Sequence, residues 1–101
     1  MSTYVVLRER GPRFDHERGL REQDGWDAHA AFMERLADEG FVLLGGVLDD
    51  GRALHVVEAG SEDEVRARFS ADPWPPDKLN VADVRPWEIL LRAPRYAALD
   101  A

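Results

Sequence analysis

The chain has 101 residues, a formal net charge of −7 and no cysteine. Its length predicts one domain spanning residues 1–101, and its 45% hydrophobic residues predict a folded chain rather than a disordered one. The excess of acidic residues argues against binding to nucleic acid or to anionic membranes, and the lack of cysteine excludes disulfides and thiolate ligands. No apolar run is long enough to span a membrane and the N-terminus does not resemble a signal peptide, so we expect a soluble, cytoplasmic protein.

The first part of the chain predicts a strand, a loop and a helix. β-Branched and aromatic residues at positions 4–7 predict the first strand, which Gly11-Pro12 closes. Polar residues at 10–24 predict a loop, which is either a functional flap or a solvated connection. Residues 24–40 predict a helix, because their apolar side chains recur on one stripe at about 100° per residue. His29 lies near the middle of that stripe and is therefore either a core histidine or a functional one.

The second part of the chain predicts a hairpin, a second helix and a final strand. A strand over residues 41–48 passes through Gly45 and Gly46, and paired glycines in a strand mark a bulge or a close approach of the backbone to another group. Ser61 and Glu64 form a capping box that starts the second helix, and the last strand contains a proline that marks a bulge or an edge position. The remaining elements are expected as a turn at 49–51, a strand at 52–59, a helix at 62–72, a strand at 81–92 and a C-terminal tail at 94–101.

The resulting order is β-α-β-β-α-β, which predicts a ferredoxin-like α+β fold. In this fold a four-stranded antiparallel sheet carries two helices on one face. Both faces of the predicted strands are apolar, as at Tyr4 and Val6 on one side and Val5 and Leu7 on the other. Two helices cover only one face of the sheet, so we expect the other face to pack against a second copy in a homodimer.

A carboxylate at the end of the second helix supplies a possible partner for His29. Asp72 falls on the side of this helix that faces the core, near the negative end of the helix dipole, where an anion needs a donor or a cation nearby. Because the two helices lie side by side on one sheet face, His29 and Asp72 are expected to meet. Such a contact fixes the tautomer of the imidazole, and the pair is then a plausible general acid/base unit.

Four motifs lie between Trp26 and Trp87 of the chain. They are Trp26-x-x-His29-x-x-Phe32-x-x-x-Leu36-x-x-x-Gly40, Leu44-Gly45-Gly46-Val47, Ala71-Asp72-Pro73-Trp74 and Val84-Arg85-Pro86-Trp87. With these motifs the chain resembles the YCII-related proteins, with one departure at Val47, where the family often has proline after glycine. The resemblance implies a ferredoxin-like fold of the dimeric α+β barrel type and an active site at the pair His29 and Asp72. The family is similar in fold to muconolactone isomerase, and one branch acts as a dehydrochlorinase.

Two functions are consistent with these features. The first is a small cofactor-independent enzyme, a lyase or isomerase, in which His29 and Asp72 move protons on a cyclic or aromatic oxygenated substrate. The second is a non-catalytic dimeric module that binds a small ligand or a protein, with the pair as a structural latch between the helices.

Other residues are candidates for substrate binding, and each also has an ordinary structural interpretation. Gly45 and Gly46 either cradle a ligand or form a bulge, and Trp74 either lines a pocket or packs in the core or dimer contact. Arg8 either holds an anionic group or is a surface charge. His16 and His55 have no partner at a ligand spacing, so no metal site is expected.

Overall fold

The alternation of buried residues from Tyr4 to Arg8 shows one face of strand β1 (Ser2–Arg10) turned toward a core. The computed structural model describes residues 1–99 of the chain. It pairs β1 with β3 (Ala53–Ala59) on one side and with β4 (Leu79–Pro86) on the other, both antiparallel. Strand β2 (Val42–Val47) joins β3, so the four-stranded sheet has the order β2-β3-β1-β4.

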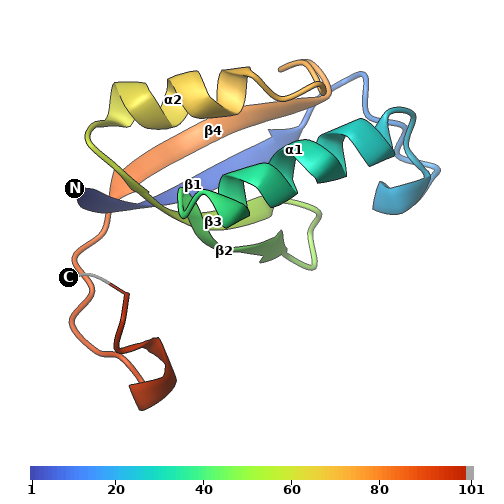
Figure 1. Cartoon of the computed structure of the whole chain (residues 1–101). Coiled ribbons are helices and arrows are strands. Elements are labelled where there is room, and N and C mark those ends of the chain that lie inside the picture. Colours follow the sequence, from blue (N-terminus) through green and yellow to red (C-terminus); the bar gives the residue numbers. More distant parts are fainter. Residues whose placement is uncertain (100–101) are drawn as a thin grey trace.

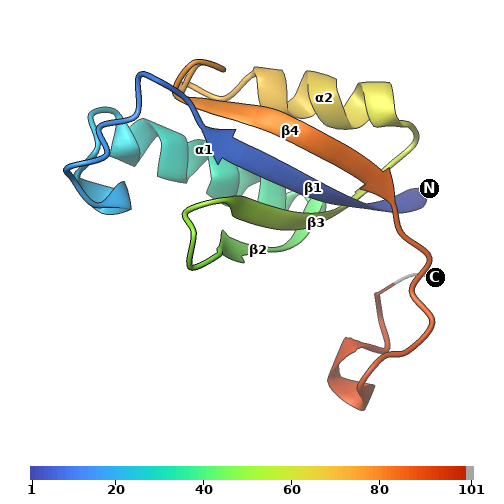
Figure 2. The same ribbon diagram turned by 180° about the vertical axis from the view of Figure 1, so that it is seen from behind.

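Two helices, α1 (Trp26–Asp38) and α2 (Glu62–Ser70), lie on the same face of this sheet (Figure 1). Seen from behind, the other face of the sheet carries no helix formed by residues 1–99 (Figure 2). The element order β-α-β-β-α-β and the antiparallel sheet confirm the predicted ferredoxin-like α+β fold.

Local signals in the sequence set the helix ends. The Ser61 hydroxyl accepts a hydrogen bond from the Glu64 N–H at 3.1 Å, as the capping box predicts, and the Glu64 carboxylate accepts from the Gly60 N–H. Helix α1 starts at Trp26 rather than Asp24, and Gly40 follows its end with a φ of +79°. This left-handed backbone is unfavourable for other residues, which explains why glycine ends the helix.

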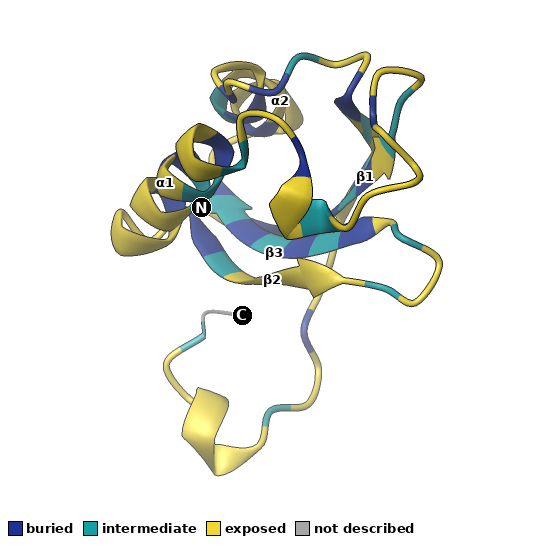
Figure 3. Cartoon of the chain, turned by 90° about the vertical axis from the view of Figure 1, so that its right-hand side faces the viewer, coloured by how far each residue is buried: buried dark blue, intermediate teal, exposed yellow. Residues whose placement is uncertain are grey.

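Apolar side chains fill the space between the helices and the sheet. In Figure 3 the buried segments lie where these two layers face each other, and most of the C-terminal segment is exposed. The main core cluster consists of Tyr4, Val6, Phe32, Leu36, Phe41, Val42, Val57, Ala59, Val65, Phe69 and Val84. A second cluster, at the end of the molecule where α1 begins, consists of Phe14, Trp74 and Leu79, with Leu20 and Trp26 packed against it.

In the segment between β1 and α1 the buried side chain of Gln23 joins several backbone groups, and Phe14 packs into the second cluster. Its amide nitrogen donates hydrogen bonds to the carbonyls of Asp15, Arg18 and Gly19 at 2.8–3.3 Å, and its amide oxygen accepts from the Asp15 N–H at 2.9 Å. A short 3₁₀ helix, η1 (Leu20–Glu22), lies within this segment. Most of the segment is exposed, as the solvated-connection alternative expects, while buried Phe14 and Gln23 anchor it to the fold.

The prediction for the last strand was partly wrong. Strand β4 begins at Leu79 and ends at Pro86, whereas the apolar pattern predicted a strand over residues 81–92. After Pro86 the chain makes one further backbone bond, from the Trp87 N–H to the Thr3 carbonyl at 2.9 Å, and then leaves the sheet. Within the described residues 1–99, no strand lies beside the apolar run that follows, and a 3₁₀ helix, η2 (Pro94–Tyr96), forms within the predicted tail.

The register shifts of the sheet do not occur at Gly45, Gly46 or Pro86, where bulges were predicted. The register of β2 shifts between Val42 and Leu44, and that of β1 against β4 shifts between Leu7 and Arg8. The alternative for Pro86, a position on an edge strand, is correct because β4 is the last strand of the sheet.

The sheet face without helices keeps an apolar surface. Val5 pairs with Val56 and Leu7 with Leu54 across β1 and β3, and all four side chains are half-buried. They alternate with the core residues of the same strands and so point away from the helices. Within residues 1–99 no helix is both long and apolar enough to cross a membrane.

Candidate active site

His29 and Asp72 meet, as the positions of the two helices predicted. The imidazole Nδ1 lies 2.9 Å from Asp72 Oδ1, and the two side chains are 8% and 1% exposed. His29 reaches this position from the buried stripe of α1, which it shares with Phe32 and Leu36. Asp72 lies just beyond the end of α2, and its N–H donates to the carbonyl of Phe69 at 3.1 Å.

Asp72 has a second partner that the sequence did not predict. Its Oδ2 accepts a hydrogen bond from Arg8 Nη1 at 2.9 Å, and the Arg8 side chain is only 2% exposed. Arg8 Nη2 also donates to the carbonyl of Leu79 at 3.3 Å. The interpretation of Arg8 as a surface charge is wrong, because the alternation of β1 puts Arg8 on the same face as Tyr4 and Val6.

This arrangement keeps Asp72 ionised. Burial alone raises the pKa of the carboxyl, but hydrogen bonds from His29 and the Trp74 N–H and the charges of His29 and Arg8 outweigh it, so the pKa lies below its ordinary value. Because the carboxylate accepts from His29, Nδ1 carries the proton and Nε2 is the ring nitrogen left to act on another molecule.

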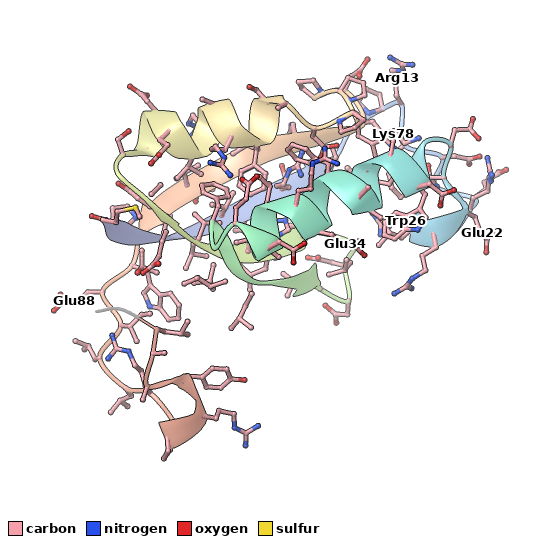
Figure 4. The ribbon with its side chains drawn as sticks, viewed as in Figure 1. Arg13, Glu22, Trp26, Glu34, Lys78 and Glu88 are labelled. Atoms are coloured by element: carbon pink, nitrogen blue, oxygen red, sulfur yellow. The ribbon has the colours of Figure 1, made fainter. Side chains whose placement is uncertain are left out.

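Trp74 holds the imidazole in a fixed plane. The two rings stack with centroids 4.0 Å apart and an angle of 6° between their planes. The Trp74 N–H donates to Asp72 Oδ1 and its indole N–H donates to the carbonyl of Asp24, both at 2.9 Å. Lys78 Nζ donates to the same carbonyl at 3.0 Å, and Figure 4 shows Lys78 at the end of the molecule where α1 begins. Trp74 is thus buried in the second core cluster, which is the packing interpretation considered for it, and it also orients His29.

A cavity of about 280 Å³ lies beside the pair, between α1 and the β2–β3 hairpin. The side chains of Met33, Val42 and Leu79 give part of its wall an apolar character. Glu34, which Figure 4 labels on α1, also lines it. The complete lining is Arg8, Arg10, Leu20, His29, Met33, Glu34, Ala37, Val42, Gly45, Gly46, Val47, Gly51, Ala53, His55 and Leu79.

Gly45 and Gly46 both border the cavity, but only Gly45 is sterically constrained. A Cβ atom on Gly45 would lie 2.7 Å from Nδ1 of His55, whereas one on Gly46 would meet no atom within 4 Å. The close approach considered for the glycine pair therefore occurs at Gly45, against the residue that faces it across β2 and β3.

His55 is the cavity residue whose importance the sequence did not indicate. Its side chain is buried and neither ring nitrogen has a hydrogen-bond partner among the described residues. Burial, followed by the charges of Arg8 and His29, lowers the pKa of His55 to about 4. The signal available was its place on the buried face of β3, in alternation with Ala53 and Val57.

The described part of the chain contains no group of three or more histidine or carboxylate side chains arranged to hold a metal ion. No family model matches the chain, and no curated protein or solved structure matches it either. The YCII-related resemblance therefore depends on the four motifs quoted above.

Proposed function

We propose that this chain is a cytoplasmic member of the YCII-related family and a small enzyme that moves protons on a cyclic or aromatic oxygenated substrate. One observation carries the proposal: His29 lines a cavity of about 280 Å³, and its buried pair with Asp72 engages Nδ1, so that among residues 1–99 no hydrogen-bond partner occupies Nε2. Buried, mutually oriented acid and base groups beside a cavity are typical of active sites.

In the proposed reaction Nε2 of His29 takes a proton from an acidic C–H bond of the substrate. The electron pair of that bond moves into the substrate, and the positive imidazolium is stabilised by the Asp72 carboxylate. Return of the proton to another atom of the substrate gives isomerisation. In elimination the C–H electron pair forms a C=C bond, the leaving group departs with the electron pair of its own bond to carbon, and the proton on Nε2 passes to solvent. Neither route changes the number of electrons held by the reacting partners together, so neither requires a redox cofactor.

The cavity supports a small substrate. About 280 Å³ is near the lower end of the range for small-molecule pockets, and its apolar wall suits a ring. Trp74 and Asp72 fix the plane and tautomer of the imidazole, so the base is already positioned before a substrate enters.

Exchange of substrate hydrogen for deuterium tests this chemistry without knowledge of the product. Small lactones, cyclic enones and hydroxylated aromatics are incubated with the protein in D₂O, and NMR follows the loss of acidic C–H signals. The wild-type protein is expected to accelerate exchange for at least one of these compounds, and His29→Ala is expected to abolish the acceleration. A wild-type protein that accelerates none of them contradicts the proposal.

The alternative is a structural latch, and the buried Arg8–Asp72 ion pair favours it. Asp72 has a structural partner even without catalysis, so His29 would then complete a network that joins α1, β1 and the end of α2. In that case His29→Ala mainly lowers the free energy of unfolding, by a few kcal/mol, and no compound shows exchange. If catalysis is the role, folding is kept and exchange is lost.

The homodimer is also part of the proposal. The support is the apolar sheet face without helices, where Val5, Leu7, Leu54 and Val56 are half-buried in one copy. A second copy laid on this face removes that surface from water. Sedimentation equilibrium at micromolar concentration tests it, and a stable monomer would contradict it.

A further inference from the structure

We infer that His55 and Arg8 form the recognition site for a substrate oxygen, a carbonyl or phenolic group, in the cavity that His29 borders. This inference rests on the proposed function, because it assumes that the substrate binds in this cavity. Beyond that function, a substrate oxygen is the group recognised, and His55 and Arg8 are the residues that bind it.

The first argument is the distribution of unsatisfied polar atoms. Within residues 1–99 the buried side-chain nitrogens without a partner are Arg8 Nε, both ring nitrogens of His55 and one nitrogen of Arg92. All but the last belong to two residues that line the same cavity. Buried polar groups are normally hydrogen-bonded, and each group left unpaired costs free energy, so their concentration in one place points to a partner from outside the chain.

The second argument is the surroundings of His55. Its ring lies 5.4 Å from the ring of Phe69, and the residue opposite on β2, Gly45, has no side chain. These neighbours would pack equally well against an apolar side chain, which would carry no unpaired nitrogen. Because residue 45 is glycine, the imidazole can lie against the backbone of β2, with its Nδ1 only 2.7 Å from where a Cβ atom of residue 45 would be.

The third argument is the charge state. Burial and the nearby charges of Arg8 and His29 lower the pKa of His55 to about 4, so the ring is neutral near pH 7 and carries one N–H. A neutral imidazole donor and the Nε–H of a cationic guanidinium together suit an oxygen acceptor, neutral or negative.

This pair of donors complements the proton transfer at His29. When Nε2 takes a proton from carbon next to a carbonyl, the C–H electron pair forms a C=C bond and the carbonyl π pair moves onto oxygen as an enolate. Donors aimed at that oxygen stabilise the developing negative charge. The substrate class is therefore a cyclic compound, with or without an aromatic ring, in which a carbonyl group is adjacent to the acidic C–H.

Binding is tested with a matched pair of probes, 2-cyclohexen-1-one and cyclohexene, followed by NMR of the histidine ring nitrogens. In the wild-type protein the ketone is expected to shift the His55 nitrogens and cyclohexene is not. His55→Leu is expected to weaken ketone binding by about tenfold, the typical loss for one hydrogen bond, and to leave binding of cyclohexene unchanged. His16→Gln, which changes an exposed histidine, is the control and keeps wild-type binding.

Folding of the variant is checked separately, by urea unfolding at pH 7. His55→Leu removes two unpaired nitrogens, so its stability is expected to equal or exceed that of the wild-type protein. Lower stability with unchanged ketone binding would show a structural histidine and overturn the inference. It is overturned as well if the ketone leaves the wild-type His55 signals unshifted.

The outcomes separate this inference from the proposed function. If His29→Ala abolishes hydrogen exchange while His55→Leu changes neither exchange nor ketone binding, the proposed function stands and the role of His55 is wrong. If no compound shows exchange but the ketone binds through His55, the site is a binding site without the proposed chemistry.

Discussion

Arg8 and Asp72 form an ion pair at 2.9 Å although 64 positions separate them in the chain and neither side chain is more than 2% exposed. The pair connects β1, an inner strand of the sheet, to the segment that follows α2. Asp72 is thus shared between a permanent cation and an imidazole, which makes it the residue on which both the fold and the site depend.

Removal of the Asp72 charge is expected to destabilise the protein strongly. Asp72→Asn keeps the shape of the side chain but leaves the guanidinium of Arg8 buried without a counter-charge, at a cost of about 3–5 kcal/mol. Urea unfolding at pH 7 measures this loss. The control is Asp77→Asn, which removes an exposed pair with Arg13 at 3.5 Å and is expected to change stability by about 0.5 kcal/mol or less. Equal losses of stability for Asp72→Asn and Asp77→Asn would contradict the role of Asp72 as the counter-charge of Arg8.

His55 makes stability depend on pH in the mildly acidic range. Its folded pKa of about 4 lies below its ordinary value of 6.5, so the unfolded chain binds a proton first as the pH falls. The contribution of His55 to the free energy of unfolding is therefore fully present above pH 6.5 and declines by about 3 kcal/mol as the pH falls to 4.

Urea unfolding of the wild-type protein and of His55→Leu at several pH values isolates this contribution. The variant is expected to lack the decline between pH 6.5 and 4. Below about pH 3.8 both proteins lose stability, because the lowered pKa of Asp72 makes protonation of that carboxylate favour the unfolded chain. If His55→Leu shows the full loss of stability between pH 6.5 and 4, other titratable groups cause that loss.

The two neighbouring glycines of β2 are expected to respond differently to alanine. Gly45→Ala places a methyl group 2.7 Å from His55 Nδ1 and displaces the ring, at a typical overpacking cost of about 1–3 kcal/mol. Gly46→Ala meets no atom and is expected to change stability by about 0.5 kcal/mol or less. Thermal unfolding compares the two, and NMR of His55 detects the displaced ring. Similar melting temperatures for both variants would show that the ring moves without cost.

A charge on the open sheet face is expected to separate the proposed dimer. Val56→Lys puts an ammonium group among Val5, Leu7 and Leu54, where a second copy would have to bury it. Sedimentation velocity is expected to give a monomer for this variant and a dimer for the wild-type protein. Ala67→Lys, on the exposed side of α2, is the control and stays dimeric. The interface lies elsewhere if Val56→Lys also sediments as a dimer.

The sequence predicted the features that repeat along one element. The apolar stripe of α1 located His29 on the buried face, and the capping box located the start of α2. These signals are local: each follows from the period of a helix or from the residues of a single turn. The His29–Asp72 contact followed from them once the two helices were placed on one sheet face.

What the sequence did not predict depends on contacts between distant elements. A lone arginine near the end of a strand is ordinarily exposed. Arg8 is buried because the carboxylate of Asp72, distant in the sequence, pairs with it beside β1. His55 looks unremarkable until β2 is placed beside it with glycine at the facing position. The apolar residues after Pro86 resemble a strand, but the sheet supplies no partner there.

The face-to-face stacking of Trp74 on His29 makes the fluorescence of Trp74 sensitive to the state of the imidazole. An imidazolium ion quenches the fluorescence of an indole in contact with it more strongly than a neutral imidazole does. Trp74 emission therefore follows the protonation of His29 without an attached label. The ring of Trp26 also lies near His29, with centroids 5.7 Å apart, and Trp87 adds a background signal. The substitutions Trp26→Phe and Trp87→Phe leave Trp74 as the single reporter, and stopped-flow fluorescence can then time the arrival of a proton at the base.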